Sequence, residues 1–147
     1  MKKYLKLLIL FSLALFIILP LNIQGNGSDV TILFTHDFHD NHETYNTEID
    51  GSIVERGGIA RLSTAIKNEQ KNSDPLIVDG GDYSQGTLFQ SIFTTHAPTL
   101  HLFDKLGYDA TTFGNHEFDF RPQGLADSLN AAAASNLSLQ IISSNTN

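Results

Sequence analysis

The chain has 147 residues, with nine lysines and arginines against 16 aspartates and glutamates, a formal net charge of −7 and no cysteine. Such an acidic chain would not bind nucleic acid by releasing counterions from its phosphates, so we expect no nucleic-acid partner. A sequence without cysteine excludes disulfides and thiolate metal ligands, which leaves packing and any bound metal to stabilise the fold.

The first segment of the chain is typical of a secretory signal peptide. Lysines open it, Leu7–Leu19 is apolar apart from Ser12, and Pro20 ends the run. This run is shorter than the roughly 20 residues that a spanning helix needs and suits the hydrophobic region of a signal peptide. We predict a signal peptide over residues 1–25, export to the periplasm, the cell envelope or the medium, and no stable membrane span after cleavage. An uncleaved N-terminal anchor is the alternative. Removal of three lysines would leave six basic against 16 acidic residues, a formal charge of −10.

The elements that follow alternate between strands and helices. Val30–Phe34 is a continuous apolar and β-branched run, as expected of a strand buried on both faces. The polar stretch His36–Glu55 is long for a connection without secondary structure, which indicates a functional or flexible segment. Gly57-Gly58 then opens a helix with apolar residues at spacings of three and four, and Asn72–Pro75 ends it.

The second half of the chain continues this alternation. The expected elements are a strand over Leu76–Val78, helices over Gly86–Phe93 and Pro98–Leu106, a strand over Ala110–Phe113, a helix over Leu125–Ala134 and a strand over Leu139–Ile142. Gly107 is expected to end the second of these helices in a left-handed conformation. Four strands that alternate with helices predict an α/β fold with a largely parallel sheet.

The domain organisation is simple, because neither an internal repeat nor a linker is evident. Residues 26–147 are therefore predicted to form one domain. The sequence ends directly after the fourth strand without a closing helix, which indicates the N-terminal part of a longer, truncated domain. A small complete α/β domain is the alternative.

Three polar blocks directly follow the first three predicted strands. They are Asp37-Phe38-His39, Gly80-Gly81-Asp82 and Gly114-Asn115-His116-Glu117. Ligands in open α/β sheets collect just beyond the carboxyl ends of the strands. The three blocks therefore predict one shared site with oxygen and nitrogen ligands for two metal ions.

The first block offers a carboxylate and an imidazole. Asp37 and His39 lie two apart at the end of an extended segment, so their side chains are expected on one face, as half of a metal site. His36 is expected on the opposite face, in a hydrogen bond within the fold. The remaining polar residues of this loop are interpreted as solvated: Asp40, His42 and Glu43.

The second block offers a carboxylate that could bridge two metals. Gly80 and Gly81 let the backbone turn away from the strand, and the two oxygens of Asp82 could bind cations about 3.5–4 Å apart. Asp79 is expected to support the turn. The alternative for Asp82 is a turn aspartate that binds its own backbone.

The third block combines an amide, an imidazole and a carboxylate. Asn115 offers a neutral carbonyl oxygen to a metal, and Asp119 could accept the N–H of His116, fix its tautomer and favour its protonated form. Three phenylalanines are expected to shield this pair from water: Phe113, Phe118 and Phe120. The alternative is an Asn-His turn with two exposed acids.

In this order the three blocks resemble those of the calcineurin-like metallophosphoesterases, and specifically their exported 5′-nucleotidase/UDP-sugar hydrolase branch. The matching segments are Ile32–His39, Gly57–Arg61, Asp79–Thr87 and Gly107–Asp119. The resemblance implies a β-sandwich core flanked by helices, of which this sequence would hold the N-terminal part.

The resemblance also implies roles for the site residues. Asp37 and His39 would bind the first of two divalent metal ions such as Zn or Mn, Asp82 would bridge, and Asn115 would bind the second. His116, oriented by Asp119, would stabilise the transition state or protonate the leaving oxygen. Asn115 and His116 would contact a nucleotide or related phosphate ester during attack by a metal-activated hydroxide.

The sequence departs from the family pattern after His116, the last histidine of the chain. Family members supply further metal-binding histidines from a later part of the catalytic domain, and a C-terminal domain recognises the nucleoside. A missing C-terminal remainder of the polypeptide is therefore the expected partner, without which the chain would be inactive. The alternatives are a non-catalytic exported metal-binding fragment and a 2′,3′-cyclic-nucleotide phosphodiesterase.

Overall fold

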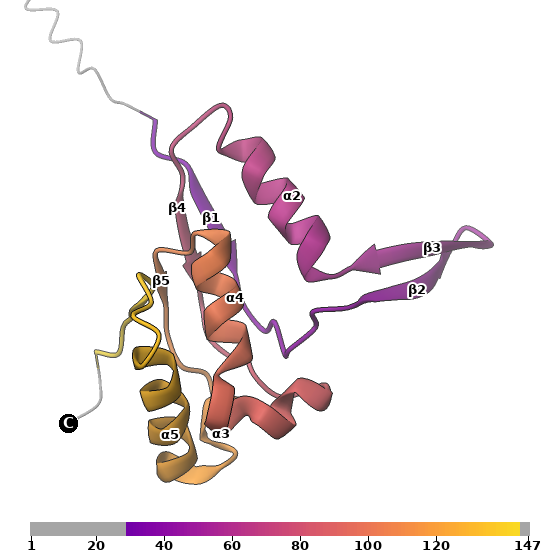
Figure 1. Cartoon of the computed structure of the whole chain (residues 1–147). Coiled ribbons are helices and arrows are strands. Elements are labelled where there is room, and N and C mark those ends of the chain that lie inside the picture. The colour runs from indigo at the N-terminus through magenta and orange to yellow at the C-terminus, as the bar shows by residue number, and fades with distance from the viewer. Residues whose placement is uncertain (1–28, 145–147) are drawn as a thin grey trace, which may run out of the picture.

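The computed structural model describes residues 29–144, so the predicted signal peptide over residues 1–25 lies outside the described part of the chain. The described residues form the predicted α/β fold, with helices packed on a parallel sheet and a hairpin that projects from it (Figure 1). Between residues 29 and 144, no helix has both the length and the apolar character that crossing a membrane requires.

Outside the first loop the predicted elements are present, but α5 begins at Arg121 instead of Leu125, β5 is shorter than predicted, and the short helix α3 was not predicted. The strands are β1 Ile32–Thr35, β2 Thr44–Ile49, β3 Ser52–Gly57, β4 Leu76–Asp79, β5 Ala110–Thr111 and β6 Gln140–Ile141. The α-helices are α2 Ile59–Glu69, α3 Phe93–His96, α4 Pro98–Leu106 and α5 Arg121–Ala133, and two short 3₁₀ helices are η1 Leu88–Ile92 and η2 His116–Phe118. The segment predicted as one helix over Gly86–Phe93 is thus mainly 3₁₀, and Gly107 ends α4 at φ 82° as predicted.

The main sheet has four parallel strands in the order β1-β4-β5-β6, which follows their order along the chain. Parallel crossovers are almost always right-handed, so strands added in one direction put their connecting helices on one face of the sheet. The core agrees, because it joins Ile66 of α2, Phe103 of α4 and Leu125 of α5 to Ile77 of β4 in one cluster. All four carboxyl ends consequently lie along the same edge.

The face of the sheet away from this core is exposed. Ile32 and Phe34 of β1 are 58% and 61% exposed, and Leu76, paired with Ile32, is 46% exposed. The expectation that the first strand is buried on both faces is therefore wrong for the described chain. The helices α2, α4 and α5 cover the other face, and among residues 29–144 no further layer covers this one.

The polar stretch after β1 is not an unstructured connection, contrary to the prediction. Its second half forms the antiparallel hairpin of β2 and β3, in which Thr44 pairs with Gly57 and Ile49 with Ser52. Asp50 and Gly51 make the two-residue turn, both at positive φ, and this dipeptide is a strong hairpin signal.

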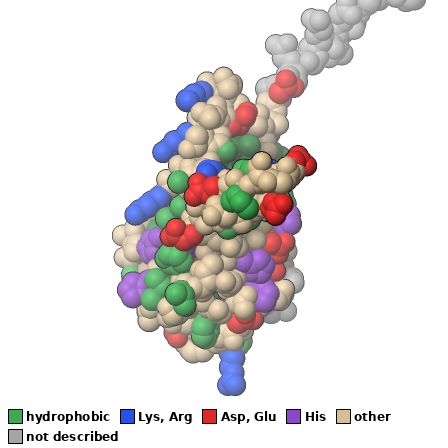
Figure 2. All heavy atoms as spheres, turned by 90° about the vertical axis from the view of Figure 1, so that its right-hand side faces the viewer, with side chains coloured by type: hydrophobic (Ala, Val, Ile, Leu, Met, Phe, Trp, Pro, Cys, Tyr) green, Lys and Arg blue, Asp and Glu red, His purple; other side chains and the backbone are tan. Residues whose placement is uncertain are grey.

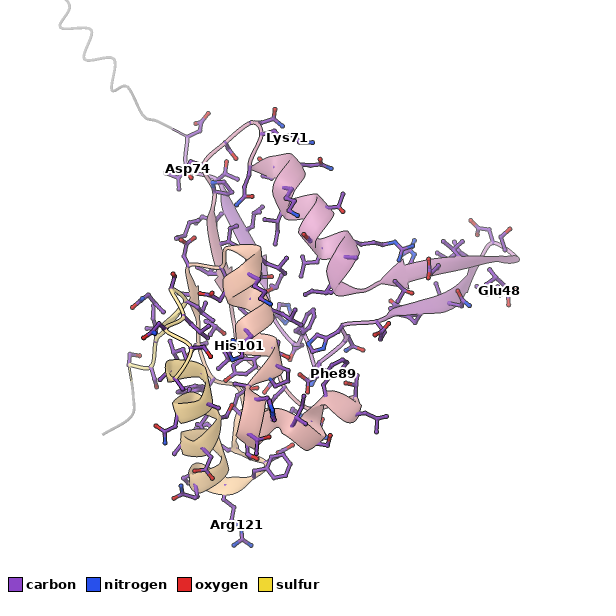
Figure 3. The ribbon with its side chains drawn as sticks, viewed as in Figure 1. Glu48, Lys71, Asp74, Phe89, His101 and Arg121 are labelled. Atoms are coloured by element: carbon purple, nitrogen blue, oxygen red, sulfur yellow. The ribbon has the colours of Figure 1, made fainter. Side chains whose placement is uncertain are left out.

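The hairpin extends away from the rest of the fold, with Glu48 near its end (Figure 3). Seen from that end, acidic side chains gather on and around it (Figure 2). This side of the molecule therefore carries part of the excess of acidic residues in the sequence.

We expect a large loss of stability when a buried side chain of the core beneath the sheet is truncated. Leu100 of α4 is 0% exposed, whereas Leu88 of η1 is 91% exposed. Leu100→Ala should lower the free energy of unfolding by about 2–5 kcal/mol through lost burial and a residual cavity. The same change at Leu88 should cost less than about 0.5 kcal/mol. Urea unfolding followed by circular dichroism measures both, and equal losses would contradict this packing.

Candidate metal centre

The first loop approaches the second through its backbone. The N–H groups of Asp37 and His39 donate to the carbonyls of Gly81 and Asp82, both at 3.0 Å. Asp37 and His39 have φ of 50° and 49°, so the segment is not extended as predicted. Their side chains still meet, because these inter-loop hydrogen bonds impose the left-handed conformation that brings them together.

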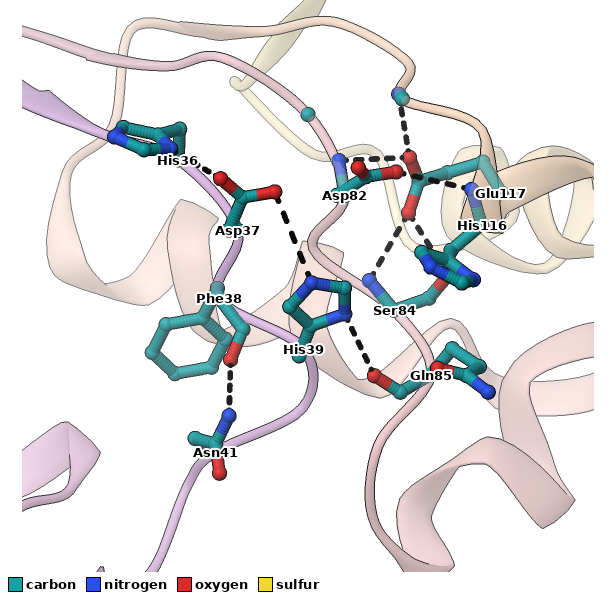
Figure 4. Close-up of polar contacts among 12 residues, drawn as sticks. His36, Asp37, Phe38, His39, Asn41, Asp82, Ser84, Gln85, His116 and Glu117 are labelled. Atoms are coloured by element: carbon teal, nitrogen blue, oxygen red, sulfur yellow. Dashed lines mark hydrogen bonds and ion pairs between the residues drawn. The ribbon is translucent and has the colours of Figure 1, made fainter.

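Three predicted ligands converge at the edge of the sheet. Single ligand atoms of Asp37, His39 and Asp82 all lie within 4.8 Å of one another, and His39 Nε2 is 3.7 Å from Asp37 Oδ1 (Figure 4). Asp37 and His39 follow β1, and Asp82 follows β4. The parallel pairing of these two strands brings the two segments together. Three donor atoms this close together could share a single divalent cation.

The tautomer of His39 suits metal binding. Its Nδ1 lies 3.0 Å from the carbonyl oxygen of Gln85, which can only accept, so Nδ1 carries the proton. In the neutral ring Nε2 then presents a lone pair toward the carboxylates. A histidine whose other nitrogen is fixed by a carbonyl is the usual arrangement at metal sites.

The charge of this donor set is not balanced by a lysine or arginine of the described residues. Within residues 29–144, the ion pairs of arginine and lysine are confined to Arg61 with Glu55. A hydrogen bond from His36 lowers the pKa of Asp37, so this carboxyl group stays ionised. Two carboxylates and an imidazole lone pair in such proximity fit a divalent metal ion.

The third block lies close against the second. A Cβ on Gly114 would be 2.0 Å from Asp82 Oδ1, and a Cβ on Gly81 would be 2.5 Å from Gly114 N, so only glycine fits at either position. The His116 N–H donates to Asp82 Oδ1 at 2.9 Å. Asn115 is exposed and directly precedes His116, whose backbone N–H binds the Asp82 carboxylate.

His116 and Asp119 form the predicted pair. His116 Nδ1 lies 2.9 Å from Asp119 Oδ2, and this hydrogen bond raises the pKa of His116. The ring of His116 meets that of His39 edge to face at 5.1 Å, which places it beside the metal candidates. The predicted shielding is wrong for Phe118 and Phe120, which are 43% and 44% exposed.

Glu117 is not among the predicted site residues, and the alternative interpretation of its turn, which leaves this acid exposed, is wrong. Glu117 is fully buried: Oε2 accepts from the N–H groups of Asp82 and Gly114 at 2.9 and 2.7 Å. Oε1 accepts from Ser84 N and Oγ at 3.0 and 2.8 Å. The spacing of Gly114 and Glu117 was an available signal, because a glutamate three residues on can reach back to a backbone N–H.

The interpretation of Asp40 and His42 as solvated loop residues is wrong. Asp40 is 2% exposed and accepts from Gln85 N at 3.0 Å and from Thr99 Oγ1 at 2.5 Å. Because the Thr99 hydroxyl hydrogen goes to Asp40, His42 Nε2, 2.9 Å away, must donate to Thr99. This chain of hydrogen bonds fastens the first loop to α4.

Asp79 supports the second loop as predicted. It accepts from Gly81 N, Thr35 Oγ1 and Thr111 Oγ1 at 2.9, 2.6 and 3.0 Å. Burial raises the pKa of Asp79, and these three donors oppose that shift. An open groove of about 730 Å³ begins beside Asp37 and extends past Tyr45 toward Arg61, and Asp37 is the one candidate ligand that lines it.

Curated relatives of this chain are 5′-nucleotidases. The rat (Rattus norvegicus) 5′-nucleotidase is 35% identical over 122 residues, which are 80% of this chain and 21% of the relative. A snake venom 5′-nucleotidase of Gloydius brevicauda is 36% identical over 113 residues, 74% of this chain and 19% of the relative. The chain thus spans about a fifth of the length of these relatives. No family model matches the chain.

Solved structures of the same kind share the fold. The 5′-nucleotidase precursor from Thermus thermophilus matches with a TM-score of 0.68 and 30% identity, over 79% of this chain and 22% of that one. A calcineurin-like phosphoesterase from Bacillus subtilis matches with a TM-score of 0.59 and 27% identity, over 77% of this chain and 36% of that one.

The buried His42 is expected to make the fold sensitive to acid. Burial lowers its pKa in the folded chain below the ordinary value of 6.5. As pH falls below about 6.5, the unfolded chain takes up a proton that the folded chain resists, so stability falls. His42→Gln should reduce this loss in urea unfolding measured at pH 7.5 and 5.5, whereas His96→Gln, at an exposed ring, should leave it in place. Equal pH dependence in wild type and His42→Gln would contradict it.

Proposed function

Since the chain belongs to the 5′-nucleotidase branch of the calcineurin-like phosphoesterases, over their N-terminal part, we propose that it contributes the first half of a metal-dependent phosphohydrolase site. The observation that supports this most is the meeting of Asp37, His39 and Asp82 beside the His116–Asp119 pair. The reaction we propose is hydrolysis of a nucleotide phosphate ester.

The proposed ligands divide between two divalent cations. Asp37, His39 and Asp82 would hold the first, and Asp82 together with Asn115 would begin the second site. Bound cations would polarise the phosphoryl oxygens and make water in the site more acidic. Two protein ligands hold a metal weakly, so we expect the other ligands of the second cation from polypeptide beyond these 147 residues. Alone, the chain is then expected to bind one metal and to hydrolyse esters poorly.

The side chains of the third block supply the proton chemistry. Asp119 favours the protonated form of His116 and fixes its ring. When water adds to phosphorus and the bond to the leaving oxygen breaks, protonated His116 can give its proton to that oxygen. Asn115 and His116 would also contact the phosphoryl group. The groove beside Asp37 offers space for the rest of the substrate.

The proposed substrate and location come from the relatives and from the start of the sequence. The relatives are 5′-nucleotidases, so a nucleoside monophosphate is the proposed substrate. The basic and apolar start of the sequence supports export by a signal peptide over residues 1–25.

Removal of a shared ligand should weaken metal binding. We expect the chain to bind Mn²⁺ in a calorimetric titration, and Asp82→Asn to raise the dissociation constant at least about tenfold. Asp74→Asn is the matched control, because Asp74 is exposed on the loop after α2 (Figure 3). Equal affinity of the wild type and Asp82→Asn would remove the basis of the proposed site.

Hydrolysis tests the role of the His116–Asp119 pair. A full-length form that contains these residues should release phosphate from AMP only with a divalent metal present. His116→Asn should lower the rate about 10²- to 10⁴-fold, the usual contribution of a general acid. His96→Asn is the control. Metal binding without hydrolysis of AMP would favour a non-catalytic metal-binding role, and faster hydrolysis of 2′,3′-cyclic AMP would favour a phosphodiesterase.

A further inference from the structure

A buried carboxylate outside the ligand set holds two of the site's loops together. Glu117 is 0% exposed, and its two oxygens accept four hydrogen bonds. The donors belong to Asp82 and Ser84 in the loop after β4 (Figure 4) and to Gly114 in the segment after β5. Each of the four bonds runs from a neutral N–H or O–H group to an oxygen of the same carboxyl group.

The pattern of these bonds relates one loop directly to the other. Oε2 alone joins Asp82 N to Gly114 N, at 2.9 and 2.7 Å. In the reverse direction, Asp82 Oδ1 accepts from His116 N at 2.9 Å. Each loop therefore donates a backbone N–H to a carboxyl group of the other loop. A shift of either loop would break both of these hydrogen bonds.

This exchange acts where the backbone is conformationally unfavourable. Asp82 has a φ of 52°, a left-handed conformation that residues other than glycine rarely adopt. Such conformations persist where surrounding contacts over-determine them. The bond from Asp82 N to Glu117 is one of those contacts, so it helps to set the direction in which the Asp82 side chain leaves the backbone.

We propose that Glu117 is a positioning residue, which holds the Asp82 carboxylate at the distance from Asn115 and His116 that the metal site needs. The inference rests on the proposed function and adds a residue that touches neither metal nor substrate. It predicts that loss of Glu117 weakens metal binding beyond what a general loss of stability would cause.

The test compares two carboxylate-to-amide variants in the full chain. Glu117→Gln keeps the volume but turns an amide N–H₂ toward backbone donors. Asp104→Asn is the control, because Asp104 at the end of α4 likewise accepts two backbone N–H groups, from Ser138 and Leu139 at 2.6 and 3.1 Å. In a Mn²⁺ titration, Glu117→Gln should raise the dissociation constant about 10- to 100-fold, as loss of supporting contacts does elsewhere. Asp104→Asn should leave it within about twofold.

A second measurement on the metal-free chain keeps the two proposals separate. Amide hydrogen exchange should show lost protection at Asp82, Ser84 and Gly114 in Glu117→Gln and not in Asp104→Asn. An unchanged dissociation constant, or loss of protection spread evenly over the chain, would overturn the role of Glu117. Failure of the wild type to bind Mn²⁺ would instead count against the proposed function. Amide exchange would still decide whether Glu117 holds the loops after β4 and β5 together.

A milder variant covers the case in which Glu117→Gln does not fold. Ser84 is buried and its Oγ donates to Glu117 Oε1 at 2.8 Å. Ser84→Ala removes this one donor and leaves the carboxylate in place. A rise in the dissociation constant for Mn²⁺, smaller than that for Glu117→Gln, would support the positioning role, and an unchanged constant would overturn it.

Discussion

The buried carboxylate of Glu117 is the interaction on which the candidate site depends. Backbone N–H groups and a carboxyl group are both costly to bury without hydrogen-bond partners, and here each satisfies the other. The donors come from the loops after β4 and β5, so one side chain relates the Asp82 segment to the Asn115–His116 segment. Asp40 likewise joins the first loop to Gln85 in the loop after β4, because it accepts the Gln85 N–H. The site is thus built between two buried acids.

The sheet brings these loops together in the first place. Because β1, β4 and β5 are parallel and adjacent, their carboxyl ends lie along one edge, and the polar blocks that follow them become neighbours. Right-handed crossovers put α2, α4 and α5 on one face, which concentrates the core there. The opposite face keeps exposed apolar residues such as Phe34. The same topology therefore explains both the convergence of the ligands and the uneven packing of the sheet.

Much of the site could be predicted from sequence because its elements are local. Apolar runs followed by Asp37, Asp82 and His116 indicated strands that end in polar loops, and parallel pairing then implied proximity. The burial of Glu117 and Asp40 could not be predicted, because a local pattern does not say which side of a loop faces the interior. The exposure of Phe118 and Phe120 could not be predicted for the same reason: apolar character favours burial, but the surrounding elements decide whether anything covers the ring.

Local sequence was sufficient for the alternation of strands and helices, because this depends on neighbours a few positions apart. The hairpin around Asp50-Gly51 was not predicted, although this dipeptide is a local signal for it. Which acids are buried, and why Asp37, His39 and Asp82 adopt positive φ, became evident only in the folded chain. Those features depend on hydrogen bonds between loops that are distant along the chain. Such bonds form only once the parallel sheet has aligned the ends of its strands.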